Sequence, residues 1–343
     1  EDEQIIFFKP KNFIDLKNFK KNKIIYGVGP VNPGFKNIKV FFLLKYLDIK
    51  LILINFFGYY LNEISQKKKL LEKIHLFFNR NFNYFFFRSL SILNLVPKIK
   101  ICFETSQLRI QLIENSISKR IEKKLKFLKI SYFEKIFRIN SIYFDEILFN
   151  QKFDNLHENL VFIDSGIDSA DNEKENIFYR KMIDKEFTIN YYKKICQRLT
   201  EISKIYNTKK IIICKHPKAK YYPECFDEFK NILVDNNADQ HIWSAKLVIF
   251  SGGSSMFNKA IILKKRILVI LSKETANYHR RLINSLNNIF KLNILDIDRQ
   301  EIDNRLISEK NFNMQEYENF INNNLIYNKS ISSPKIIRSV IFN

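Results

Sequence analysis

The chain has 343 residues, of which 46% are hydrophobic and 27% are charged, so it can bury a large core and is not a disordered protein. Its length exceeds one typical domain and fits two domains of medium size. The formal net charge of +21 favours anionic partners, namely nucleic acid, a membrane surface, or phosphorylated and acidic sugars. AT-rich coding bias, which enriches Lys, Ile, Asn and Phe, is an alternative source of part of this charge.

The positive charge is concentrated in the first part of the chain. Residues 1–150 contain 27 Lys and Arg against 13 Asp and Glu, a net charge of +14. The clusters Lys67–Lys69 and Lys119–Lys129 contribute much of it, and the aromatic run Phe85–Phe87 lies between them. Basic and aromatic side chains together are typical of peripheral contact with an anionic membrane. A solvated helix face has the same pattern and is the alternative.

The sequence shows no secretory signal, membrane span or metal-ligand spacing. The chain begins without a secretory signal pattern. The most apolar long stretch, Val40–Leu61, contains Lys45, Asp48 and Lys50, so we expect no membrane span. Four cysteines lie far apart without metal-ligand spacing, which argues against a zinc site or a disulfide framework. We expect a cytoplasmic protein that needs no metal and can lie at the inner face of the cytoplasmic membrane.

In the first part of the chain, short apolar runs alternate with a helical period. Ile24–Tyr26 is a predicted strand that runs into Gly27-Val28-Gly29-Pro30, a helix is predicted from 35 to 47, and a buried strand follows at Leu51–Ile54. This order is a βαβ unit. Further strands are predicted at Lys100–Phe103 and Ile142–Phe144.

The pattern restarts after a polar stretch at 150–158. The predicted strands are Leu160–Ile163, Ile211–Cys214, Leu247–Phe250 and Ile267–Ile270, and the predicted helices are 192–206 and 256–263. Continuous apolar strands alternating with helices are typical of parallel sheets covered on both faces. We predict an α/β fold with two tandem Rossmann-like domains facing a central cleft, at 1–155 and 156–310. A tail at 311–343 follows, and whether it crosses back to the first domain is left open.

Polar clusters follow three of the predicted strands in the second domain. They are Asp164-Ser165-Gly166, Lys215-His216-Pro217 and Ser251-Gly252-Gly253-Ser254-Ser255. Ligands of open parallel sheets bind beyond the carboxyl ends of the strands, so we expect these clusters at one edge of one sheet. Six of the seven glycines follow predicted strands, which fits tight turns or the close approach of a ligand.

The residue types in two of these clusters suit a phosphate group. Backbone N–H groups and hydroxyls of the Ser251–Ser255 loop, which opens a predicted helix, are typical phosphate donors. Capping of that helix by Ser254 or Ser255 is the alternative. Pro217 holds His216 in an extended conformation, so that its imidazole, beside Lys215, can donate to a phosphate oxygen.

The remaining candidates are carboxylates and glycines. Asp164 stands at its strand end and can act as a general base on a hydroxyl. An Asx-turn is the alternative role, and Asp168 is near enough to be the base instead. Gly27 and Gly29 lack the full G-x-G-x-x-G pattern, which argues against dinucleotide binding. We assign them instead to the acceptor side of a cleft. Asp296-Ile297-Asp298 has the D-x-D form of some metal sites and is interpreted as a turn.

In their order along the chain, the three clusters resemble the motifs of one enzyme family. Bacterial GT-B-type glycosyltransferases of surface polysaccharides, notably sialyltransferases and polysialyltransferases, carry an acidic-acidic-Gly motif, a His-Pro motif and a Ser-Ser or Ser-Thr motif. The matching residues here, within roughly 160–270, are Asp164-Ser165-Gly166, His216-Pro217 and Ser254-Ser255. The first motif departs from the family because it has a single carboxylate.

The resemblance implies an inverting, metal-independent transferase with no cofactor beyond its nucleotide-sugar donor. The enzyme would move sialic acid or a related acidic sugar from a CMP-sugar to an anionic surface glycan or a lipid-linked glycan, such as those of lipopolysaccharide or capsule. Asp164 would deprotonate the acceptor hydroxyl, and His216 would bind the donor phosphate as it leaves. Lys215, Pro217 and the Ser251–Ser255 loop complete the donor site.

Three other functions remain open at this stage. A UDP- or GDP-sugar-dependent GT-B glycosyltransferase would have the same fold and a different donor. A basic nucleic-acid-binding protein would explain the charge, but the sequence has no helix-turn-helix, RNA-binding-sheet or zinc-finger pattern. A non-catalytic scaffold of polysaccharide assembly would bind no nucleotide.

Overall fold

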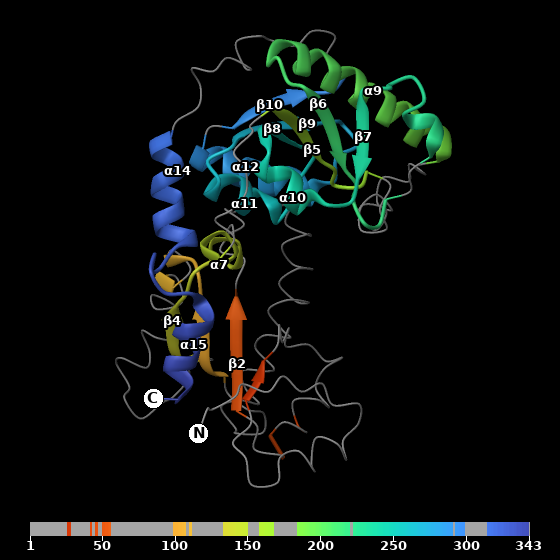
Figure 1. Ribbon diagram of the computed structural model, residues 1–343. Helices are drawn as coiled ribbons and strands as arrows, with labels where there is room; N and C mark the ends of the chain where they lie inside the picture. The colour runs from red at the N-terminus through yellow and green to blue at the C-terminus, as the bar shows by residue number, and fades with distance from the viewer. Residues whose placement is uncertain are drawn as a thin grey trace. The chain divides into compact units, whose positions relative to one another are not determined.

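The computed structural model describes residues 26–28, 42, 45–46, 50–55, 99–107, 110–111, 133–149, 158–167, 184–219, 222–290, 292–298 and 314–342. The chain divides into two compact units (Figure 1). Among the described residues, the first unit comprises those up to Ile139 and those from Ile336 onward, and the second comprises Asn140 to Lys335. The domain boundary predicted at 155 lies outside the described residues, as do the basic clusters, the run Phe85–Phe87 and most of the helix predicted at 35–47.

The first unit contains a four-stranded parallel sheet. Its strands, in spatial order, are β1 (Tyr26–Val28), β2 (Lys50–Asn55), β3 (Ile99–Glu104) and β4 (Phe133–Arg138). Buried Ile52, Phe103 and Ile139 form its core together with Ile337, which lies on the C-terminal helix α15 (Ser333–Phe342). The end of the chain therefore packs on the first sheet.

The second unit contains a six-stranded sheet in which all neighbouring pairs are parallel. Its strands are β5 (Asn159–Ile163), β6 (Lys210–Cys214), β7 (Ile232–Asp235), β8 (Ala245–Phe250), β9 (Arg266–Leu271) and β10 (Asn293–Asp296). Their spatial order is β10-β9-β8-β5-β6-β7. The predicted α/β class with parallel sheets is confirmed.

Helices cover both faces of the second sheet (Figure 1). One face packs against α9 (Lys185–Ile205), and the short 3-10 helix η3 (Pro223–Cys225) joins it. The other face packs against α7 (Ile142–Phe149), α10 (Ala238–Trp243), α11 (Met256–Ile262), α12 (Asn277–Phe290) and α14 (Met314–Phe320), which continues into the π-helical turn η5 (Ile321–Leu325). In β5, Leu160 and Phe162 face α9, whereas Val161 and Ile163 face the other layer. Burial on both sides explains why these strands are continuously apolar.

The start and the buried face of helix α9 follow from its sequence. Asp184 is the N-cap, and its side chain accepts a 2.7 Å hydrogen bond from the backbone N–H of Phe187, which satisfies one of the free donors of the first turn. Buried residues from Thr188 to Ile202 recur at helical spacing and face the sheet.

One predicted strand is wrong. Ile142–Phe144 forms the start of helix α7, where the backbone N–H groups of Phe144 and Asp145 donate to the carbonyl oxygen of Ser141. An apolar run of three residues is too short to separate a strand from a helix by its period. The strand that precedes this helix, β4, was not predicted, because charged residues interrupt its apolar pattern.

Candidate functional site

The three polar clusters of the second unit meet where the strand order of its sheet reverses. The chain runs outward from β5 through β6 to β7, and then returns to the other side of β5 with β8. Such a switch point is where open α/β sheets bind ligands. One pocket of about 450 Å³ lies there, formed by the ends of β5, β6 and β7, the start of α10, the loop before α11 and His279 of α12. This volume is in the range of small-molecule sites.

Asp164 is held at the end of the central strand from two directions. Its side chain is 4% exposed, and Tyr192 of α9 donates a 2.8 Å hydrogen bond to Oδ2. The hydroxyl of Ser251 lies 3.4 Å from Oδ1 and 3.0 Å from the hydroxyl of Ser165, and it also hydrogen-bonds the hydroxyl of Tyr191. The backbone N–H of Ser165 donates to the same Ser251 oxygen at 2.8 Å. These contacts tie the ends of β5 and β8 together, and Asp164 lines the pocket.

The glycines of the Ser251–Ser255 loop allow close packing within the protein. A Cβ atom on Gly252 would lie 2.9 Å from Cγ of His279 and from the side chain of Ser165. A Cβ atom on Gly253 would lie 2.1 Å from Cδ2 of Leu282. Both distances are shorter than real Cβ contacts, so a side chain at either position would force Ser165, His279 or Leu282 to shift.

The pocket contains two imidazoles. His216 follows β6, and its Nδ1 accepts a 3.2 Å hydrogen bond from the backbone N–H of Lys218. His279 is buried, and its Nδ1 accepts a 2.9 Å hydrogen bond from the backbone N–H of Gly253. Burial, and secondarily the nearby His216, lowers the pKa of His279 to about 4, so the buried ring is neutral at pH 7. His279 was not among the predicted site residues, because nothing in the sequence links a helical histidine to a strand end.

The serines at the start of α11 have separate contacts. The hydroxyl of Ser254 accepts a hydrogen bond from the backbone N–H of Met256 at 3.2 Å. Ser255 occupies the N-cap position without a side-chain capping bond, and it hydrogen-bonds the hydroxyl of Tyr143, whose pKa burial raises. Both serines line the pocket, and Ser254 also accepts a hydrogen bond from the first residue of α11.

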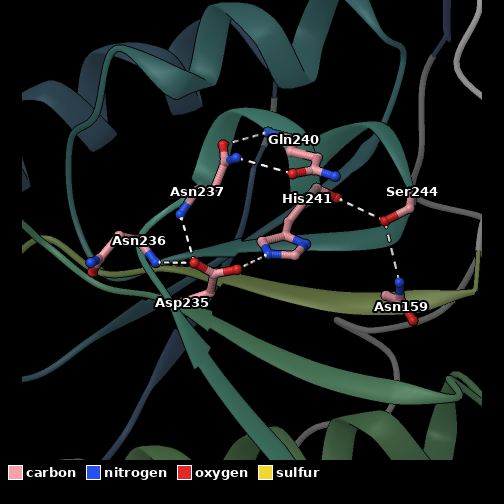
Figure 2. A network of polar contacts seen from close by, with 7 residues as sticks. All are labelled: Asn159, Asp235, Asn236, Asn237, Gln240, His241 and Ser244. Atoms are coloured by element: carbon pink, nitrogen blue, oxygen red, sulfur yellow. Dashed lines mark hydrogen bonds and ion pairs between the residues drawn. The ribbon is translucent and has the colours of Figure 1, made fainter.

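A polar network supports the pocket wall after β7 (Figure 2). The carboxylate of Asp235 accepts hydrogen bonds from the backbone N–H groups of Asn236 and Asn237 and lies 2.7 Å from Nε2 of His241. The hydrogen bond with His241, followed by those two N–H groups, lowers the pKa of Asp235. Asn237 also caps α10 by accepting from the backbone N–H of Gln240. Asn236 and Asn237, which line the pocket, are thereby fixed in position.

A buried lysine lies behind the same wall. Lys259 of α11 is fully buried, and its Nζ forms 2.8 Å ion pairs with Glu146 and Asp239 and lies 5.4 Å from the ring centroid of Trp243. Asp239 lines the pocket. Its negative charge is therefore paired with a cation on the side away from solvent.

The other predicted positions lie elsewhere. Gly27 is the middle residue of β1 in the first unit and pairs with Leu51, whereas Gly29 and Asp168 lie outside the described residues. Asp296 and Asp298 form a turn in which the backbone N–H of Asp298 donates to Asp296. Within the described part of the chain, no three His, Cys, Asp or Glu side chains are grouped as metal ligands. No helix of that part is long and apolar enough to span a membrane.

Comparisons with known proteins bear on the fold. No protein-family model matches the chain, and no curated protein sequence matches it. The calicheamicin glycosyltransferase CalG4 has a similar structure, with a TM-score of 0.52 at 9% identity, over 96% of this chain and 78% of that one. A UDP-GlcNAc 2-epimerase from Methanocaldococcus jannaschii has a TM-score of 0.48 at 14% identity, over 96% of this chain and 81% of that one. The chain thus has the two-domain α/β fold of the GT-B type.

Proposed function

We propose that this protein is a glycosyltransferase that uses a nucleotide-sugar donor. The observation that carries the proposal is the pocket at the switch point of the second sheet, which brings together His216, Lys215 and the serines before α11. Imidazole, ammonium and hydroxyl groups are suitable ligands for the phosphates of such a donor. The fold, which the calicheamicin glycosyltransferase shares, agrees with this function.

The proposed reaction is an inverting transfer. A hydroxyl of the acceptor attacks the anomeric carbon of the donor sugar, and the bond between that carbon and the phosphate oxygen breaks. The nucleotide leaves with the electron pair, stabilised by hydrogen bonds from His216 and from Ser254 or Ser255. The acceptor proton passes to a carboxylate base. We propose that the protein needs no metal for this step, and that Gly27 and Gly29 belong to the acceptor side.

We assign the base to Asp164. Oδ2 is held by Tyr192 at 2.8 Å, whereas the Ser251 contact with Oδ1 is the longer one at 3.4 Å. Asp164 lines the pocket at the end of the central strand, where a bound acceptor hydroxyl can pass its proton to the carboxylate. Asp164→Asn would then lower kcat by about 100-fold or more, while nucleotide affinity would change little.

The identity of the donor nucleotide is a more specific part of the proposal. The three motifs resemble those of sialyltransferases, which suggests a CMP-linked acidic sugar. The calicheamicin glycosyltransferase, whose fold this chain shares, is not described as a sialyltransferase, and a UDP- or GDP-sugar donor has at least as much support. The acceptor in either case is proposed to be an anionic glycan or glycolipid, and the basic first part of the chain suits such an acceptor or an anionic membrane surface.

A thermal-shift panel with CMP, CDP, UDP, GDP and a short oligonucleotide tests the proposal. A ligand at about 100 times its dissociation constant adds roughly 2.7 kcal/mol to the stability of the folded state, which is a shift of several degrees for about 150–250 residues. We expect one class of nucleotide to shift Tm in the wild type and not in His216→Ala, and the matching sugar nucleotide to be consumed. A shift with the oligonucleotide alone, reduced steeply by salt, would instead support nucleic-acid binding. Absence of any nucleotide effect would overturn the proposal.

A further inference from the structure

The two histidines of the pocket share one hydrogen-bonding pattern. In each ring, a backbone N–H group points at Nδ1, from Lys218 to His216 at 3.2 Å and from Gly253 to His279 at 2.9 Å. A ring nitrogen that accepts a hydrogen bond carries no proton, and a neutral imidazole has a single N–H group. Both rings in their neutral form therefore carry the proton on Nε2.

The ring of His279 is also fixed in place. Its Cγ would lie 2.9 Å from a Cβ atom on Gly252, and Leu282 of the same helix packs equally closely on Gly253. The side chain is 5% exposed and lines the pocket. A buried group held this tightly loses little conformational freedom when it binds a ligand.

The pocket is thus lined by two imidazole rings from different elements, one on the loop after β6 and one on α12. Neutral N–H groups bind anionic oxygens without requiring protonation, as backbone amides do at anion sites. Lys215 and Ser254 line the same pocket and supply a positive charge and a hydroxyl. This set of donors matches an oxyanion with several oxygens.

We propose that His279 is a second phosphate-binding residue, whose Nε2–H group acts together with that of His216 on one phosphate of the ligand. The inference rests on the proposed function as far as that phosphate belongs to a nucleotide-sugar. Inorganic pyrophosphate has the same chemistry and separates the phosphate contacts from the nucleotide contacts.

Two substitutions distinguish the two ring nitrogens. The side-chain oxygen of His279→Asn can accept the hydrogen bond from Gly253 but has no group at the position of Nε2. The amide nitrogen of His279→Gln reaches the position of Nε2 but leaves Gly253 without its acceptor. Asn284→Gln, at an exposed position on the same helix, is the control. Calorimetric titration with pyrophosphate, CMP, UDP and GDP would give the affinities, and thermal unfolding would show that each variant is folded.

We expect His279→Asn to bind pyrophosphate at least about 10-fold more weakly than the wild type, which is the loss typical for one hydrogen bond to a charged group. His279→Gln should recover part of that loss, and the control should bind like the wild type. Wild-type affinity in His279→Asn, or binding by His279→Gln no stronger than by His279→Asn, would overturn the inference and leave the proposed function intact.

A second measurement does not depend on the variants being stable. In wild-type protein labelled with ¹⁵N-histidine, the Nε2–H signals of both His216 and His279 should shift when pyrophosphate is added. An unchanged His279 signal at saturation would overturn the inference. Pyrophosphate binding with the expected pattern but no sugar transfer with any donor would refute the proposed function alone, whereas no binding of pyrophosphate or of any nucleotide would refute both.

Discussion

The hydroxyl of Tyr192 donates a 2.8 Å hydrogen bond to Oδ2 of Asp164, so the helix on one face of the second sheet holds the carboxylate at the end of the central strand. Tyr192→Phe removes this donor and leaves a buried carboxylate with one hydrogen bond fewer. We expect the free energy of unfolding to fall by about 1–3 kcal/mol and kcat to fall with it, because the proposed base loses its orientation. Denaturant unfolding and steady-state kinetics would measure the two effects.

Tyr327→Phe is the control for this substitution. Tyr327 is 53% exposed, so loss of its hydroxyl should change stability by less than about 0.5 kcal/mol. Equal stability of the two variants would contradict the assigned role of the Tyr192–Asp164 hydrogen bond.

The glycines of the Ser251–Ser255 loop lead to a prediction about packing. Gly253→Ala places a methyl group 2.1 Å from Cδ2 of Leu282, and we expect overpacking to cost at least about 1–3 kcal/mol. Leu282→Ala removes the obstructing atoms, so the double variant should be more stable than the sum of the two single effects predicts, by about 1 kcal/mol or more. A double-mutant cycle measured by urea unfolding tests this coupling, and additive effects would show that α12 does not require glycine there.

The central strands and their ends could be predicted from the sequence for a physical reason. Strands covered by helices on both faces are apolar at every residue, and a polar residue directly after such a run marks the carboxyl edge of the sheet. Leu160–Ile163 followed by Asp164, and Ile211–Cys214 followed by Lys215, are of this kind. The edge strands β7 and β10 are only partly buried, so their apolar runs are too weak to recognise.

The parts of the pocket that the sequence did not reveal depend on tertiary contacts. His279 reaches the pocket because α12 packs on two glycines more than 20 residues away in the chain. His241 supports the pocket wall after β7 through its hydrogen bond with Asp235. Neither His279 nor His241 belongs to a local sequence motif. Short motifs identify the residues after a strand, whereas the contacts that orient them become visible only in the fold.

The low pKa of His279 predicts a stability change in acid. The pKa is about 4 in the folded protein, because burial penalises the charged ring, and it is near its ordinary value of 6.5 when the chain is unfolded. Between these values the unfolded chain binds more protons, so the free energy of unfolding falls as pH decreases from about 6.5 to about 4. The contribution of this residue to that fall is roughly 3 kcal/mol.

Unfolding measured between pH 4 and pH 7.5 tests this contribution. His279→Asn keeps an acceptor for Gly253 and does not titrate, so its stability should depend less steeply on pH than that of the wild type. The hydrogen bond between Asp235 and His241 is present in both the wild type and His279→Asn. Its contribution to the pH dependence of stability is therefore the same in both proteins and cancels in the difference. Identical slopes would mean that His279 does not titrate at the low value.

The side chain of Asn140, the first residue of the second unit, makes four hydrogen bonds. Its amide nitrogen donates to Ile331 O and Asp145 Oδ1, and its oxygen accepts from the backbone N–H groups of Tyr327 and Asn328. The backbone N–H of Ser333 donates to the same Asp145 carboxylate. One buried amide thus joins the segment after β4 to the segment before α15, with every donor and acceptor of its side chain in use.

Asn140→Asp keeps the size of the side chain and replaces two donors with acceptors. The new carboxylate would face the Ile331 carbonyl oxygen and the carboxylate of Asp145, so we expect a loss of roughly 2–4 kcal/mol in the free energy of unfolding at pH 7. The same change at exposed Asn323 should cost less than about 0.5 kcal/mol. Lowering the pH toward 4 should reduce the difference between the two variants, because protonation of either carboxylate at the buried site restores a donor between them. A difference that is constant with pH would show that the cost comes from local rearrangement and not from two opposed carboxylates.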